Sequence, residues 1–402
     1  MSGVLRSLRI RNYRIWAVGA IVSNTGTWMQ RTAQDWMVLT QLTQHNATAV
    51  GAVLACQFAP QLLFLPVTGL AADRFNRRTV LMVTQAAMSV LSLSFGALTL
   101  TGHIQLWHVY VLASLFGTAA AFDAPVRHTF VSELVDTPLL SNAVALNSTS
   151  FNSARMLGPA IAGVMIGVTD VGWVFVVGAA SFAAVLASLF LIRTAELRRP
   201  PVPLESRPGN MADGFRHVLK RSDLRTVILM FFLAGSFCNN FQIFIPAMTV
   251  SVFGRGPGAF GLLSSVLAVG SVIGALLAAR RESLAFSQLL TGAAVFTAAL
   301  GLGAVAPTFV LFAVALIVVG TAVQTFATAA FSLVQLSTEP ELRGRVMAIM
   351  LAAGLGGTLV GGPVVGAISD AFGPRWSVAT GAFAGLTVLA IGTHHQVRGR
   401  RR

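Results

Sequence analysis

Long apolar runs constrain this chain more than any other feature of its sequence. Hydrophobic residues make up 55% of it and charged residues only 10%, which excludes an ordinary soluble domain. A run of about 18 apolar residues crosses about 30 Å of hydrocarbon as a helix. We therefore expect an all-α membrane protein with twelve membrane-spanning helices. They are placed at residues 15–40, 49–71, 80–101, 107–126, 143–167, 172–192, 224–248, 259–279, 285–304, 309–334, 346–368 and 376–393.

The first apolar run is expected to be retained as a span. It is too long for a signal peptide, it contains Asn24, Arg31 and Asp35, and no small-residue cleavage pattern follows it.

Basic residues are distributed very unevenly along the chain, whose net charge is +14. With the N-terminus inside, 24 of the 28 Lys and Arg residues fall in cytoplasmic segments, and only Arg255 and Arg375 fall in outer loops. This positive-inside distribution predicts a cell (inner) membrane protein with both termini in the cytoplasm. A basic inner face in contact with anionic membrane lipids explains the charge, so nucleic acid is not expected as a partner.

Two pairs of proline positions indicate an internal duplication. Pro138 and Pro340 stand 202 residues apart, and Pro159 and Pro363, each preceded by glycine, stand 204 apart. Half of the 402 residues is 201, so two six-helix halves with a substrate site between them near mid-membrane are expected. The predicted domains are an N-terminal six-helix bundle (1–192), a cytoplasmic linker with a short amphipathic helix (193–223), and a C-terminal six-helix bundle (224–402).

The loop between the second and third predicted helices carries a dense charged motif. It reads Gly69-Leu-Ala-Ala-Asp73-Arg74-Phe-Asn76-Arg77-Arg78. This pattern resembles the signature loop of the major facilitator superfamily, which controls the inner gate of secondary transporters. The resemblance implies the major facilitator fold and a gating role for this loop.

Each residue of the loop has an expected physical task. Gly69 allows two helices to approach closely, and Asp73 is expected to accept hydrogen bonds from the N-terminus of the eleventh helix. Asn76 replaces the usual glycine, and because asparagine tolerates positive φ better than most residues, the turn is expected to survive. Arg74 is assigned to the gate with Asp73, while Arg78 and its neighbour reach helix ends or lipid headgroups, or act only as topology anchors. The corresponding loop of the second half, 274–281, lacks the acid, so gating should be asymmetric.

The fifth predicted helix contains Gly158-Pro159 followed by Gly163. This resembles the antiporter motif of the superfamily, with Ala162 in place of one glycine. Small residues there are expected to seal the helix against its neighbour and to close a leak path.

Ionisable residues inside predicted spans are candidates for coupling. Arg31 and Asp35 lie four residues apart, hence on one helix face, and Arg155 lies midway along the fifth span. Because such groups are costly in hydrocarbon, we expect a cavity where a proton and the substrate compete. The alternative is a neutral Arg31–Asp35 pair that only orients the helix.

Asp123, near the inner end of the fourth span, is expected to form a gating ion pair with Arg74 or Arg78, with proton coupling as the alternative.

Enzyme and cofactor motifs are missing from the sequence. There is no P-loop, nucleophile elbow, zinc-protease or dinucleotide motif, and the histidines show no metal spacing. We therefore expect no enzymatic activity, no cofactor and no metal, and a process driven by ion or substrate gradients.

Three further segments resemble the branch of the superfamily that contains bacterial enterobactin exporters and multidrug-efflux relatives. They are Asp123-Ala-Pro-Val-Arg-His, Asn142-Ala-Val-Ala-Leu-Asn147 and Leu157-Gly-Pro-Ala. The resemblance implies export of a small amphipathic molecule, a drug or siderophore, by proton antiport through alternating access, with a monomer expected. The alternatives are an importer or lipid flippase on the same fold and, less favoured because the gate loop is intact, a membrane sensor or scaffold.

The charge distribution yields a direct test of topology. Single cysteines at Thr43 and Gly258 should react with a membrane-impermeant maleimide added to intact cells, and cysteines at Ser206 and Glu339 should not. Labelling in the reverse sense would contradict the whole topological assignment.

Overall fold

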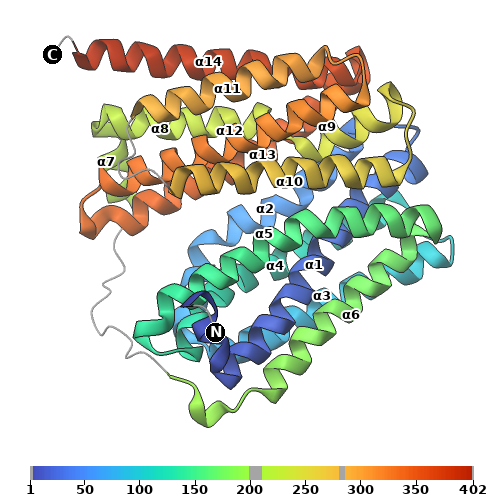
Figure 1. The fold of residues 1–402 in the computed structure, drawn as a ribbon, viewed down its shortest axis with the longest axis vertical. Coiled ribbons are helices and arrows are strands. Elements are labelled where there is room, and N and C mark those ends of the chain that lie inside the picture. Colours follow the sequence, from blue (N-terminus) through green and yellow to red (C-terminus); the bar gives the residue numbers. More distant parts are fainter. Residues whose placement is uncertain (1–2, 199–210, 280–285, 401–402) are drawn as a thin grey trace. The chain divides into compact units, whose positions relative to one another are not determined.

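Every regular element of the described chain is a helix. The computed structural model describes residues 3–198, 211–279 and 286–400 (Figure 1). The α-helices are α1 (Arg11–Met37), α2 (Ala47–Arg74), α3 (Arg77–Leu100), α4 (Leu106–Leu134), α5 (Thr137–Val168), α6 (Val171–Leu191), α7 (Met211–Lys220), α8 (Ser222–Leu233), α9 (Phe241–Ala247), α10 (Pro257–Ala279), α11 (Phe286–Ala304), α12 (Phe309–Leu336), α13 (Pro340–Phe372) and α14 (Pro374–Arg400).

The spans agree with the expected architecture. Within the described residues, eleven helical segments are long and apolar enough to cross a membrane, with α8 and α9 forming one of them. The twelfth span is α1, whose 27 residues reach about 40 Å. Its polar side chains, which include Gln30 and Asp35, lower its hydropathy. The expected all-α, twelve-helix membrane protein is confirmed.

Several helices extend beyond the apolar runs that predicted them. α5 begins at Thr137 rather than 143 and α13 at Pro340 rather than 346, each with proline in its first turn, where the missing N–H costs no hydrogen bond. α4 continues to Leu134, past the predicted end at 126, with Pro125 inside it. Hydropathy indicates the part of a helix that lies in hydrocarbon, and these helices continue beyond that part into the polar region at the membrane surface.

The seventh span is interrupted instead of continuous. α8 is followed by a π-helical turn, Ala234–Cys238, and α9 begins only at Phe241. The Asn240 side-chain amide donates to the carbonyl of Ser236 at 2.6 Å. Such a side-chain partner satisfies a carbonyl that the interrupted helix leaves without its regular donor.

The chain forms two compact units. The first contains Met1–Met37, Leu63–Glu205 and Pro257–Ser265, and the second contains Val38–Leu62, Ser206–Gly256 and Val266–Arg402. The division passes through α2 and α10, so each of these helices contributes to both units. It thus differs from a division at residues 192 and 224.

Within the first unit, α3 packs against α6 and α4, and α1 packs against α6 and α5. Trp16 of α1 and Phe130 of α4 meet edge to face in the core, with ring centroids 5.1 Å apart. Within the second unit, α11 packs against α12 and α14, and α13 packs against α14 and the π-helical turn.

The amphipathic helix expected in the linker is α7. Val218 is buried on its apolar face, and Asp213 pairs with Arg345 of α13 at 3.6 Å. The proline-rich segment before it, residues 199–210, lies outside the described residues.

Candidate functional site: charged clusters in the first unit

Asp123 is the centre of a buried hydrogen-bond cluster. The residue is only 5% exposed. One carboxylate oxygen accepts from Thr84 Oγ1 at 2.9 Å and Gln85 Nε2 at 2.7 Å, and the other accepts from Arg127 Nε at 2.8 Å. Three donors therefore compensate a carboxylate that could not otherwise leave water at an acceptable cost.

The cluster joins three helices. Thr84 and Gln85 come from α3, and Asp123 and Arg127 come from successive turns of α4. The Gln85 carbonyl oxygen also accepts from Ser23 Oγ of α1 at 3.2 Å. One amide side chain thus connects α1 to the carboxylate on α4 and holds both helices against α3.

The ion pair that Asp123 forms differs from the one expected with Arg78. Its ion pair is with Arg127, not with Arg78, whose Nε donates to the carbonyl of Leu189 at 2.8 Å; the Arg74 side chain is not among those described. Because α4 continues to Leu134, Asp123 lies about 16 Å from the helix end.

A polar cavity of about 240 Å³ adjoins this cluster. Its volume could hold several water molecules, each of which needs about 30 Å³. It is lined by side chains from α1, α3, α4 and α5: Asn24, Thr27, Met88, Ala120, Asp123, Ala124, Arg127, His128, Asn147, Ser148, Phe151 and Asn152. Water and hydrogen-bonding substrate groups suit such walls.

A second charged cluster surrounds Trp28. The guanidinium carbons of Arg31 and Arg155 lie 5.3 and 5.9 Å from the centroid of this one indole ring, a distance that allows cation–π attraction. Asp35, which is 3% exposed, lies one turn beyond Arg31 on α1. The structure thus brings the predicted residues Arg31 and Arg155 to a common aromatic surface between α1 and α5.

Trp28 itself was not predicted. The three-residue spacing between Trp28 and Arg31 places both on one face of α1, so the signal was present in the sequence. The position of Arg155 opposite them depends on how α5 packs, which spacing alone does not reveal.

The glycines of the antiporter motif lie at close helix contacts. A Cβ on Gly158 would be 2.6 Å from the Trp28 Cβ, and one on Gly163 would be 2.6 Å from the carbonyl oxygen of Pro257. Ser265 of α10 also donates to the carbonyl of Met156 at 2.6 Å. The backbone next to Pro159 is thus pressed against α10, as a sealing role requires; that role remains a prediction.

The gate loop is described only in part. The side chains of Gly69, Asp73 and Arg74 lie outside the described residues, so their gating roles stay predictions. Asn76 has φ −63°, so the turn does not use the positive φ that asparagine tolerates, and its side chain caps α3 by accepting from Thr79 N at 3.4 Å. Arg78 does reach a helix end, the last turn of α6.

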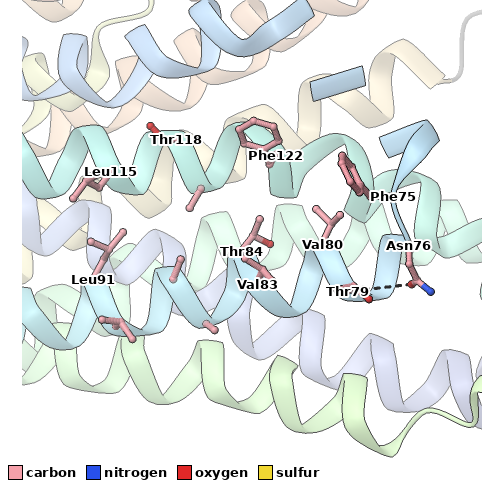
Figure 2. Close-up of a pocket in the computed structure, with 14 residues that line it drawn as sticks. Phe75, Asn76, Thr79, Val80, Val83, Thr84, Leu91, Leu115, Thr118 and Phe122 are labelled. Atoms are coloured by element: carbon pink, nitrogen blue, oxygen red, sulfur yellow. Dashed lines mark hydrogen bonds between the residues drawn. The ribbon is translucent and has the colours of Figure 1, made fainter. Parts of the chain in front are cut away.

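A groove of about 980 Å³ lies along α3 and α4. Figure 2 shows Val80, Val83 and Thr84 of α3 and Thr118 and Phe122 of α4 around it. No lining residue is charged. Such walls suit hydrocarbon and are unsuited to the charge coupling that the two clusters could support.

The second unit contains an aromatic cavity of about 300 Å³. Five phenylalanines line it: Phe58, Phe231, Phe296, Phe326 and Phe331. The Phe231 ring meets that of Phe331 edge to face at 5.3 Å. Asn239 and Thr358 add polar groups to the wall. Apolar walls with a few polar groups are typical of small-molecule sites.

Comparison with known proteins agrees with this architecture. A family model described as "Transmembrane secretion effector", within the major facilitator superfamily (MFS), matches residues 2–401. The chain belongs to this family and is an MFS transporter.

Named relatives include transporters of siderophores and drugs. The staphyloferrin A transporter of Staphylococcus aureus is 29% identical over 62% of this chain and 62% of its own. The enterobactin exporter EntS of Shigella flexneri is 23% identical over 88% of this chain and 83% of its own. The multidrug efflux pump Tap of Mycolicibacterium fortuitum is 27% identical over 87% of this chain and 88% of its own.

A solved structure supports the fold. A point mutant of the nucleoside transporter NupG superimposes with a TM-score of 0.78 at 13% identity, covering 96% of this chain and 99% of its own. At that identity the likeness concerns the fold alone.

The Asp123–Arg127 ion pair yields a testable double-mutant cycle. Asp123→Asn should destabilise the purified protein by about 3 kcal/mol, because it leaves the Arg127 charge buried without its counter-ion. In an Arg127→Met background the same substitution should cost much less. Thermal unfolding in detergent measures both effects.

The exposed pair Arg193–Glu196, whose side chains are 62% and 46% exposed, supplies the control. Glu196→Gln should change stability by less than about 1 kcal/mol. Equal costs of Asp123→Asn with and without Arg127 would show that the two charges are not coupled.

Proposed function

We propose that this protein exports a small amphipathic molecule, drug-like or siderophore-like, by proton antiport through alternating access in a bacterial inner membrane. Membership of a secretion-effector family and relatives named as an enterobactin exporter and a multidrug efflux pump support export. The substrate, protons and membrane lipids are then its partners, and a monomer is the expected functional unit.

The observation that carries the proposal is the charged cluster around Trp28. A buried carboxylate, Asp35, shares α1 with Arg31, and a second arginine, Arg155, faces the same indole ring. Ionisable groups within a membrane span are functional candidates because their burial is costly. A proton and an anionic or hydrogen-bonding substrate group can compete for these charges.

The two units offer complementary chemistry to an amphipathic substrate. Cationic and amide side chains surround the cavity of the first unit, whereas phenylalanine rings dominate that of the second. A molecule with an aromatic part and a polar or acidic part could use both kinds of group in the course of transport.

Coupling is tested at Asp35. Asp35→Asn mimics the protonated carboxyl, so it should abolish proton-driven accumulation while binding and downhill exchange persist. A charge moving through 100 mV supplies about 2.3 kcal/mol, or roughly a fifty-fold concentration ratio, and this ratio should fall to about one. Proteoliposomes with an imposed gradient give the measurement.

Asp170 provides the control, because it caps α6 by accepting from Gly172 N at 2.7 Å and has no expected part in coupling. Asp170→Asn should retain accumulation. If Asp35→Asn proteoliposomes still concentrate substrate, the carboxylate is structural and coupling belongs elsewhere, with Asp123 the next candidate.

The direction of substrate transport distinguishes an exporter from an importer, and movement of phospholipid distinguishes both from a flippase. Substrates found by a thermal-shift screen of siderophores and drugs should accumulate inside inside-out vesicles when a proton gradient is imposed. Accumulation in right-side-out vesicles would indicate an importer. Movement of labelled phospholipid between leaflets, without soluble substrate, would indicate a flippase.

A further inference from the structure

The gate-loop motif recurs near the end of the chain. Residues 66–78 read PVTGLAADRFNRR and residues 363–375 read PVVGAISDAFGPR. Proline, valine, glycine, aspartate, phenylalanine and arginine match at one constant offset of 297. The second copy covers the last turns of α13 and the first two residues of α14, the eleventh and twelfth spans, and Asp370 occupies the position of Asp73.

The two copies also share a contact. Arg78 and Arg375 are each the second residue of the helix that follows the loop, α3 and α14. Arg78 donates to the carbonyl of Leu189 in the last turn of α6 at 2.8 Å, and Arg375 donates to that of Ala304, the last residue of α11, at 2.9 Å. In both copies an arginine binds the negative end of a neighbouring helix.

The carboxylate of Asp370 binds the N-terminus of α2. One oxygen accepts from Ala47 N at 2.7 Å, and the other accepts from Thr48 N at 2.8 Å and from Thr48 Oγ1 at 2.5 Å. These donors include N–H groups that a helix start leaves without internal partners, and the helix dipole favours the negative charge. A residue 322 positions away in sequence thus caps α2.

Glycines bring the two helices into backbone contact beside this cap. A Cβ on Gly366, one turn before Asp370, would lie 2.5 Å from the carbonyl oxygen of Ala47. A Cβ on Gly51 would lie 2.4 Å from that of Gly362. All of these residues belong to the second unit, so the start of α2 is held on α13 by both packing and charge.

We propose that Asp370 is a second gating residue, the counterpart of Asp73 at the opposite face of the membrane. Because α2 spans the membrane, its two ends lie on opposite faces. Asp370 holds its first end on α13, and the gating role of Asp73 at its other end is a prediction. For access to alternate, the Asp370 contact must break when the start of α2 leaves α13. This inference rests on the alternating access of the proposed function and adds the residue that closes the outer side.

The test follows the accessibility of the start of α2. Ala49, which is buried, is replaced by cysteine in a background in which Cys56 and Cys238 are serine, and labelling by a membrane-impermeant maleimide is timed in intact cells. Asp370→Ala should raise the labelling rate about threefold to thirtyfold, the range expected from loss of a helix cap. Asp170→Ala, which removes the cap of α6 instead, should leave the rate unchanged.

A second variant opens the same contact by a different route. Gly366→Ala places a Cβ against the backbone of Ala47 and should also speed labelling. Gly344→Ala, on the same helix with no neighbour within 4 Å of the added atom, should not. This pair keeps the test decisive if Asp370→Ala fails to accumulate.

Labelling that stays at the wild-type rate in both Asp370→Ala and Gly366→Ala would overturn the proposal and leave Asp370 a static helix cap. The readout requires neither a substrate nor a proton gradient. Faster labelling together with a negative export assay would therefore support the gating role of Asp370 and reject the proposed export function. An unchanged labelling rate together with a positive export assay would reject only the gating role of Asp370.

Discussion

The structure depends on one constraint, which is that hydrocarbon offers no partner to a polar group. Asp123 meets it with donors from α3 and α4, and Gln85 extends the network to Ser23 on α1. A carboxylate inside the bilayer must therefore be surrounded by side chains of several helices. Each buried charge thus fixes the positions of those helices, and the sites where chemistry is possible are also the sites that determine packing.

The fold was largely predictable because each apolar run had to become a helix. The predictions were wrong where a helix extends beyond its apolar run or is interrupted within it. The fourth span was expected to end at 126, whereas α4 continues to Leu134. Helical periodicity does not reveal the interruption of the seventh span before Phe241.

The candidate site was predictable where its residues share a helix and not where they meet across helices. Arg31 and Asp35 were paired by spacing, whereas the position of Arg155 beside Trp28 depends on how α5 packs against α1. Asp370 was not predicted, because the corresponding loop at half the chain length, which begins at Gly274, has no acid. The matching copy stands at an offset of 297, with its cap on a helix start 322 residues away.

The contacts of Asp123 also bear on which carboxylate can carry protons. Its ion pair with Arg127 is largely buried, with side chains 7% and 12% exposed. Protonation of Asp123 would leave that arginine without a counter-charge in every transport cycle, a cost of several kcal/mol. A substrate anion would have to replace the lost charge at the same moment. Proton binding at Asp123 therefore requires an obligatory exchange with an acidic substrate.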